Sequence, residues 1–182
     1  MSKKHIAVLV GSMRENSYSR RIANLLIQLA PASLELEMVE IGNLPLFSED
    51  VDAEKPQSYA EFREKIRAAE GFLFITPEHN RSLSAALKNA IDVGSVPWGN
   101  NGWNGKPGAV VSSSTGPTEG ALANQAVRQT VVNLNVFMLQ HPDVSLNNVN
   151  KSFDKEGNLI NEEAMESLKE LMKQFENWVQ KF

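Results

Sequence analysis

The chain has 182 residues, 42% of them hydrophobic and 22% charged, which fits one globular domain over residues 1–182 rather than a disordered or fibrous chain. Its formal net charge of -4 gives no basic surface for nucleic acid, so we expect no nucleic-acid partner. The absence of cysteine excludes disulfides, thiolate metal sites and cysteine nucleophiles, and it fits a cytoplasmic location.

The first residues, MSKKHIAVLVGSM, place two lysines before an apolar run, as a secretory signal does. The run IAVLV is much shorter than the core of about 7–15 residues that such a signal needs, and no small-residue cleavage pattern follows. Nothing in the chain approaches the ~20 apolar residues of a membrane span. We therefore expect a buried first strand and no membrane partner.

Apolar runs and helical patterns alternate along the chain. Residues 5–11 predict a strand covered on both faces, because polar residues do not alternate with the apolar ones. Residues 34–41 alternate strictly, which indicates an edge or half-covered strand. Three further strands are expected at 71–77, 106–114 and 136–140.

Helical spacing of apolar residues fills most of the intervals. The first helix follows the first strand and ends before Pro31, and others are expected at 84–95, at 120–134 and from Asn161 onward. The remaining helix is marked by Tyr59, Phe62, Ile66 and Ala69. The last helix carries one apolar stripe that we expect to pack on the sheet, formed by Met165, Leu168, Met172, Phe175, Val179 and Phe182.

Two connecting stretches are expected to be loops. Residues 44–56 form a long polar connection. Residues 96–105 contain two tryptophans, Trp98 and Trp103, which either flank the mouth of a site or pack at the surface.

Fivefold alternation of strand and helix predicts a doubly wound α/β fold, a five-stranded parallel sheet in the order 2-1-3-4-5 with helices on both faces. In this order the first, third and fourth strands are neighbours, and ligands bind beyond their carboxyl ends. Three polar loops follow these strands: GSMRENSYS, PEHNRS and SSSTGPTEG. We expect them to form one continuous rim.

The first loop indicates an anion site. It leads into a helix, whose N-terminal N–H groups and dipole attract an anion, while Ser12, Ser17 and Ser19 add hydroxyls and Arg14 adds a cation. The alternative is a set of ordinary helix-capping serines and solvated arginines. The loop lacks the G-x-G-x-x-G of a dinucleotide site, the G-K-[ST] of a triphosphate site and a phosphatase cysteine. A single terminal phosphate remains the best match.

The other two loops are less specific. Glu78 and His79 could serve acid–base chemistry, but no serine or threonine nucleophile pairs with them from sequence, which disfavours a hydrolase. The histidines at 5, 79 and 141 lack metal-ligand spacing, so we expect no metal. Small residues in the third loop would let backbone N–H groups approach a flat polar ligand, unless this stretch is merely a flexible turn.

Together, the segments GSMRENSYS, TPEHNRSLSAALKNAID and SSSTGPTEGA resemble the NADPH-dependent FMN reductase family, from residue 5 to about residue 140. This flavodoxin-like family includes chromate reductases, quinone reductases and related azoreductases. The resemblance implies bound FMN, reduced by NADPH or NADH and reoxidised by a small-molecule electron acceptor. Quinones, azo compounds, flavins and oxidising metal ions such as chromate are the acceptors it implies. It also implies a homodimer or homotetramer with the flavin near a subunit boundary.

The resemblance further implies roles for twelve residues. Ser12, Arg14, Ser17 and Ser19 would hold the FMN phosphate. The residues expected to line the isoalloxazine and ribityl region are Pro77, Glu78, His79 and Asn80. Those expected at the pyrimidine end are Ser113, Ser114, Thr115 and Gly116. No side chain is an obligate catalytic acid or base, because the flavin carries the hydride chemistry.

The sequence departs from the family at two places. His79 stands where the family usually has tyrosine; an imidazole can stack on a flavin but titrates near neutral pH. SAALKNAIDV stands where the family commonly has PG-x-LKNAIDW, which changes the turn and removes an aromatic side chain. Two other classes stay open: a flavodoxin-type electron carrier, and a regulatory protein that binds a nucleotide or sugar phosphate.

Overall fold

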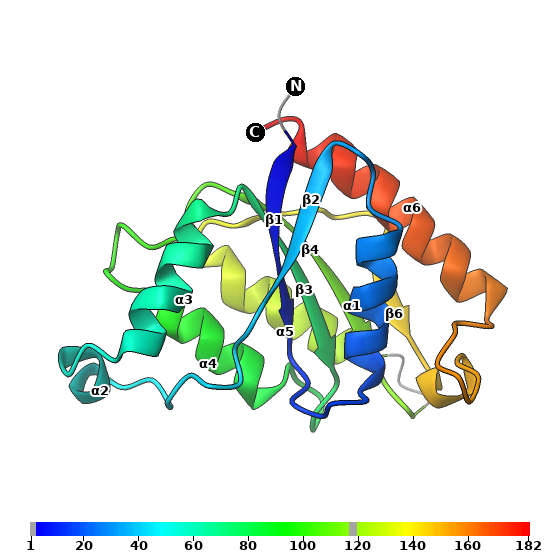
Figure 1. Ribbon diagram of the computed structural model, residues 1–182, viewed down its shortest axis with the longest axis horizontal. Helices are drawn as coiled ribbons and strands as arrows, with labels where there is room; N and C mark the ends of the chain where they lie inside the picture. The colour runs from blue at the N-terminus through cyan, green and yellow to red at the C-terminus, as the bar shows by residue number, and fades with distance from the viewer. Residues whose placement is uncertain (1–2, 117–119) are drawn as a thin grey trace.

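A parallel sheet forms the centre of the computed structural model, which describes residues 3–116 and 120–182 (Figure 1). Its strands lie in the spatial order β2 (Leu34–Val39), β1 (Lys4–Val10), β3 (Gly71–Pro77), β4 (Pro107–Ser113) and β5 (Phe137–Met138). The predicted order 2-1-3-4-5 is confirmed, and the alternating segment is the edge strand β2.

The last position in the sheet is divided between two short strands, a correction to the single strand expected at 136–140. β5 pairs with the start of β4, and β6 (Val144–Leu146) pairs with its end, both in parallel. The interruption between them contains Pro142, which has no N–H to donate to a ladder. Three residues are too few to show a period, so the sequence pattern does not reveal β6.

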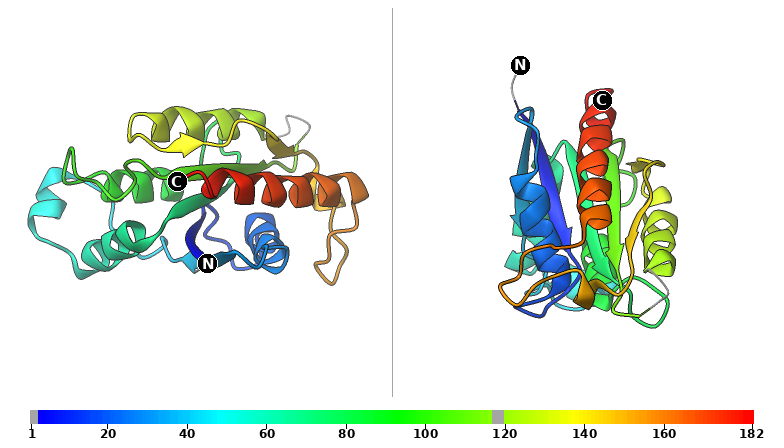
Figure 2. Two further views of the ribbon diagram at one scale, coloured as in Figure 1. Left: turned by 90° about the horizontal axis from the view of Figure 1, so that it is seen from above. Right: turned by 90° about the vertical axis from the view of Figure 1, so that its right-hand side faces the viewer.

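Helices cover both faces of the sheet. α1 (Tyr18–Gln28) and α6 (Glu162–Val179) pack on one face, and α3 (Gln57–Ala68), α4 (Ala85–Gly94) and α5 (Ala121–Val132) pack on the other. The right-hand view of Figure 2 shows the sheet between α1 and α5. This arrangement creates two hydrophobic cores, one on each side of the sheet.

The unbroken apolar runs follow from burial on both faces. In β1, Ile6, Val8 and Val10 belong to the core under α1 and α6, whereas Ala7 and Leu9 belong to the opposite core. No residue of this set is more than 4% exposed. A polar side chain at any of these positions would be buried without a partner, so the pattern of a half-exposed strand is absent.

The α-helices agree with the sequence except in one connection, and a short 3-10 helix, η1 (Val149–Lys151), was not expected either. The polar stretch at 44–56 contains a short helix, α2 (Glu49–Ala53), whose N-cap Ser48 accepts a hydrogen bond from the N–H of Val51. Five residues are too short for a helical period to be seen. The predicted stripe of the last helix packs as expected at its centre, and its end at Phe182 is 48% exposed.

The two tryptophans of the 96–105 loop have opposite environments. Trp103 is completely buried, its indole N–H donates to the carbonyl of Ile91, and its ring centroid lies 4.7 Å from that of Phe72. Trp98 is 74% exposed. Trp103 therefore belongs to the core beside the start of β4 and does not flank a site. Across the described residues, none of the helices combines the length and apolar character that crossing a bilayer requires.

Candidate functional site

The loops that leave β1, β3 and β4 meet at one edge of the sheet, the lower edge in Figure 1. They enclose a cavity of about 170 Å³. Its lining consists of Ser12, Arg14, Ser17, Tyr18, Ser19, Pro77, Glu78, His79, Ser113, Ser114, Thr115 and Val149. Ten of the twelve residues expected from the sequence are in this set, and Asn80 and Gly116 are outside it. Tyr18 and Val149 were not expected, and residues 117–119 of the third loop lie outside the described structure.

The start of α1 presents unsatisfied N–H groups. Ser17 is the N-cap: its hydroxyl oxygen accepts from the N–H of Arg20 at 3.1 Å, and its carbonyl accepts from the N–H of Arg21 at 3.1 Å. The N–H groups of Tyr18 and Ser19, in the first helical turn, have no acceptor among the described residues. Two orphan donors at the positive end of a helix dipole are an anion site.

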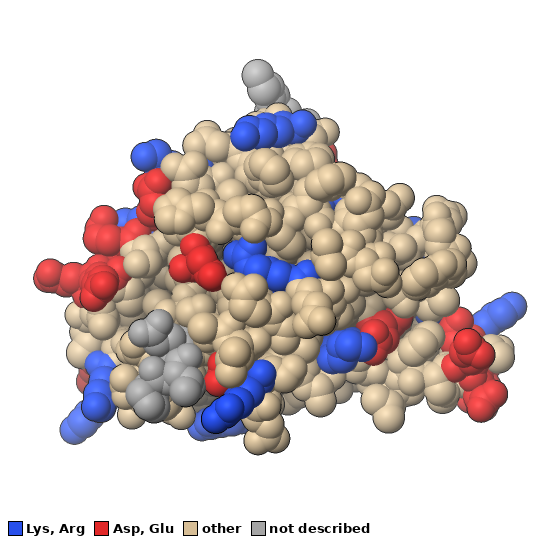
Figure 3. All heavy atoms as spheres, turned by 180° about the vertical axis from the view of Figure 1, so that it is seen from behind, with Lys and Arg blue, Asp and Glu red and all other residues tan. Residues whose placement is uncertain are grey.

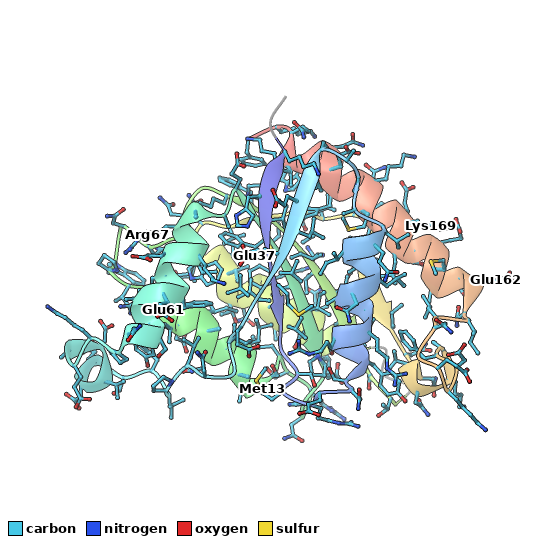
Figure 4. The ribbon with its side chains drawn as sticks, in the orientation of Figure 1. Met13, Glu37, Glu61, Arg67, Glu162 and Lys169 are labelled. Atoms are coloured by element: carbon cyan, nitrogen blue, oxygen red, sulfur yellow. The ribbon has the colours of Figure 1, made fainter. Side chains whose placement is uncertain are left out.

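Side chains add to this site. Ser12, Ser17 and Ser19 are at most 6% exposed, although each carries a hydroxyl, and Arg14 from the same loop is exposed. Figure 4 labels Met13 in this loop, at the lower edge. Hydroxyls at a helix start can donate to the acceptor oxygens of an anion, so these serines suit the same ligand as the free N–H groups.

The first and second loops approach each other closely beneath the cavity. The N–H of Gly11 donates to the carbonyl of Ile75 at 2.7 Å. A Cβ at Gly11 would lie 2.5 Å from the hydroxyl oxygen of Ser84, so only glycine fits here. Thr76 is fully buried; its hydroxyl donates to the carbonyl of Pro77 and accepts from the N–H of Ser84. Thr76 thus closes the base of the second loop.

The second loop is a tight hairpin. The backbones of His79 and Ser82 exchange two N–H···O bonds of 3.0 Å, and the residues between them, Asn80 and Arg81, have φ values of 50° and 64°. Left-handed backbone at both central positions defines a type I′ turn. The turn exposes all three residues: His79 at the cavity, and Asn80 and Arg81 beyond it.

Glu78 joins the second loop to the end of β4 and to the start of α5. Its N–H donates to the carbonyl of Ser113, and its carboxylate accepts from the N–H of Ala123 at 3.4 Å. Ala123 lies in the first turn of α5, whose N-cap is Gly120 with φ of 74° and no side chain to cap the helix. Glu78 therefore supplies from a distance the N-terminal acceptor that α5 lacks.

The third loop is held by the segment after β6. The N–H of Ser114 donates to the carbonyl of Leu146, the N–H of Val149 to the carbonyl of Ser114, and the N–H of Asn148 to the carbonyl of Gly116. These bonds bring Val149 to the cavity. The segment is far from the loop in sequence and carries no motif, so sequence reasoning could not find it.

Metal chemistry has no support in the described residues, 3–116 and 120–182. Within them, no group of three or more His, Asp or Glu side chains is arranged to hold a metal ion. The cavity combines a helix N-terminus, buried hydroxyls and an arginine on one side with two narrow loops on the other. These features define a flavodoxin-like α/β protein whose rim has the donors that suit a phosphate group.

Comparison with known proteins makes this class more specific. The chain belongs to the NADPH-dependent FMN reductase family, whose model matches residues 5–151. The resemblance seen in the three loop motifs is thereby confirmed, and the protein is an oxidoreductase that uses FMN and NAD(P)H.

Individual relatives span almost the whole chain. A quinone reductase from Pseudomonas putida is 49% identical over 175 residues, which cover 96% of this chain and 94% of the relative. A 2-hydroxy-1,4-benzoquinone reductase from Burkholderia sp is 37% identical, with 96% and 95% covered. Among solved structures, FerB, a flavoenzyme NAD(P)H:(acceptor) oxidoreductase from Paracoccus denitrificans, has a TM-score of 0.87 and 31% identity, with 98% of both chains covered.

Proposed function

We propose that this protein is an FMN-dependent NAD(P)H:quinone oxidoreductase. One observation carries the proposal: orphan N–H groups, buried hydroxyls and Arg14 line the same cavity as the second and third loops. The similarity to a quinone reductase and to a benzoquinone reductase supports quinones as the acceptor class. Azo compounds, flavins and chromate are further acceptors to assay, and the family resemblance favours a homodimer or homotetramer.

The phosphate of FMN binds at the start of α1. The N–H groups of Tyr18 and Ser19 donate to it, together with the hydroxyls of Ser12, Ser17 and Ser19. The Ser17 hydroxyl already accepts from Arg20, so its own proton is available to the phosphate. Arg14 neutralises the dianion from the solvent side.

The second and third loops would hold the ribityl chain and the flavin ring between them. Pro77, Glu78 and His79 line one side, while Ser113, Ser114 and Thr115 line the other. Asn80 and Gly116 act through the turns that they form. Glu78 holds the two sides together, because it bonds to both Ser113 and α5.

FMN, when bound, accepts a hydride from NAD(P)H and passes electrons to the acceptor. The residues lining the cavity would bind and orient it, with the first loop at its phosphate and the second and third loops at its ring. His79 is exposed at the cavity and lies where a stacking substrate enters. NAD(P)H and the acceptor would use the same open face of the flavin in turn, which predicts ping-pong kinetics.

A spectrum followed by steady-state kinetics tests the proposal. The purified protein is expected to show flavin absorption bands, to oxidise NADH or NADPH with 1,4-benzoquinone, and to give parallel double-reciprocal lines. Bound FMN without turnover would support a flavodoxin-type electron carrier instead. Failure to bind FMN would support a phosphate-binding regulatory protein.

A further inference from the structure

The tip of the second-loop hairpin holds a residue that its backbone does not favour. Both central positions of a type I′ turn require positive φ; glycine adopts this at no steric cost and asparagine tolerates it. Here Asn80 is followed by Arg81, with φ of 64°. An arginine in the left-handed region costs stability, and such residues concentrate at binding sites and switches.

The guanidinium of Arg81 is not used by the fold. Four arginines have a side-chain partner: Arg20 with Glu40 and Met38, Arg21 with the Tyr18 and Phe153 rings, Arg63 with Asp52, and Arg128 with Asn124 and Asp143. The exposed Arg14 and Arg67 resemble Arg81 in having none among the described residues, but neither lies on the second loop. Arg81 is exposed and has no hydrogen bond or ion pair with any described residue. Arg81 is strained and unpaired, so a glycine at this position would serve the fold equally well.

Its position separates it from the phosphate end of the cavity. Arg14 lies in the first loop with the phosphate donors, whereas Arg81 lies two residues beyond His79, on the side assigned above to the flavin ring. In Figure 3, Lys and Arg atoms lie among Asp and Glu atoms along the lower edge, the edge at which β1, β3 and β4 end in Figure 1. Arg81 is thus an exposed cation near the cavity, on the side away from the phosphate donors.

We propose that Arg81 binds the 2′-phosphate of NADPH and gives this enzyme a preference for NADPH over NADH; this inference rests on the proposed function. The two hydride donors differ only in that phosphate, and arginine pairs with a phosphate through two parallel N–H···O bonds. Arginine is also the residue that accommodates this group in dinucleotide-binding folds. The cation is held at the tip by the rigid hairpin.

Two substitutions test the proposal in the FMN-loaded enzyme. Arg81→Gly removes the cation and relieves the backbone, so the hairpin is retained, while Arg81→Lys keeps the charge. With saturating 1,4-benzoquinone, Arg81→Gly is expected to raise the KM for NADPH about tenfold and the KM for NADH less than twofold, with kcat for either donor within about twofold. Arg81→Lys is expected to recover most of the NADPH effect.

A redox-silent probe supplies the second measurement. By calorimetry, adenosine 2′,5′-bisphosphate is expected to bind the wild type about tenfold tighter than Arg81→Gly, whereas 5′-AMP binds both proteins alike. The wild-type preference for the bisphosphate is expected to fall with added NaCl, because salt screens exposed charges. Arg67→Gln, a change of an exposed arginine on α3, is the matched control and should alter neither affinity.

Equal changes for both donors, or no change for either, would overturn the assignment of Arg81. Turnover of NADH by Arg81→Gly would then show that the proposed function itself stands. A wild type that binds FMN but oxidises neither donor would refute the proposed function. The bisphosphate measurement would still decide whether Arg81 recognises the phosphate.

Discussion

The two ends of the parallel sheet treat their polar groups differently. At the amino end, Lys4 is paired with Glu70 within the chain at 2.9 Å. The ammonium group of Lys106 donates to the carbonyls of Ile66 and Arg67, in the last turn of α3. The amino end is thus satisfied by the protein itself.

The carboxyl end leaves donors without acceptors. The N–H groups of Tyr18 and Ser19 and the guanidinium of Arg81 have no partner among the described residues. Both ends are built from the same strands and the same kind of loop. The comparison indicates that the amino end stabilises the fold and that the carboxyl end binds ligands. Substitutions at the amino end should therefore change the free energy of unfolding, and substitutions at the carboxyl end should change ligand affinity.

The largest expected effect is on the amino end. Trp103→Ala removes a fully buried indole that packs on Phe72 and Gly94, and should lower the free energy of unfolding by about 4 kcal/mol. Urea denaturation measures this value. Trp98→Ala, in the same loop but 74% exposed, is the control and should change it by less than about 0.5 kcal/mol. Similar losses of stability from both substitutions would contradict the conclusion that Trp103, and not Trp98, belongs to the core.

A smaller loss of stability is expected directly beneath the cavity. Thr76→Val keeps the shape but leaves the carbonyl of Pro77 and the N–H of Ser84 without the threonine hydroxyl, which should cost about 2 kcal/mol. Thr130→Val is the matched control, since its half-buried hydroxyl only bonds back to Ala126 within α5. A loss at Thr130 as large as that at Thr76 would show that closure of the second loop is not the cause.

A substitution at the phosphate site should lower FMN affinity and leave the stability of the fold nearly unchanged. Arg14→Ala is expected to weaken FMN binding about tenfold, or about 1.4 kcal/mol, while the stability of the apoprotein changes by less than about 0.5 kcal/mol. Titration of apoprotein with FMN, followed by flavin fluorescence, gives the affinity. Arg67→Ala, remote from the cavity, should leave it unchanged. An unaltered affinity in Arg14→Ala would refute its role.

The smallest effect concerns pH. Burial lowers the pKa of Lys106 to about 8, although Glu70 opposes this shift. Because the folded pKa is below the unfolded value of about 10.5, the unfolded chain binds more protons between these values, and stability should rise from pH 8 to pH 10.5. Solvent screening limits the contribution to about 1 kcal/mol.

Lys106→Met provides the corresponding measurement. The slope of the unfolding free energy against pH between 8 and 10.5 should be smaller in this variant than in the wild type. FMN affinity should not change, because Lys106 lies at the end opposite the cavity. Identical slopes would show that Lys106 does not titrate in this range.

Much of this architecture follows from local sequence. Strands buried on both faces, such as β1 and β3, leave an unmistakable apolar run, and glycine and serines at 11–19 mark the loop before α1. β6 and α2 are too short for any period, and their existence depends on pairing and packing with distant parts of the chain.

The candidate site shows the same division. Residues within the three motifs were found, but Val149 reaches the cavity through bonds to Ser114 that no local pattern announces. The burial of Trp103 likewise depends on contacts with Phe72 and Ile91, both far away in sequence. The strain at Arg81 depends on backbone pairing across the hairpin.

The edge strand β2 has a consequence for self-association. Its unpaired side would be a template for strand addition by a second copy. β2 exposes Glu35 and Glu37, and Glu37 is paired with Lys65 and His5, so this edge carries charged side chains. Charged side chains on an edge strand disfavour strand addition, so this edge disfavours fibrous aggregation.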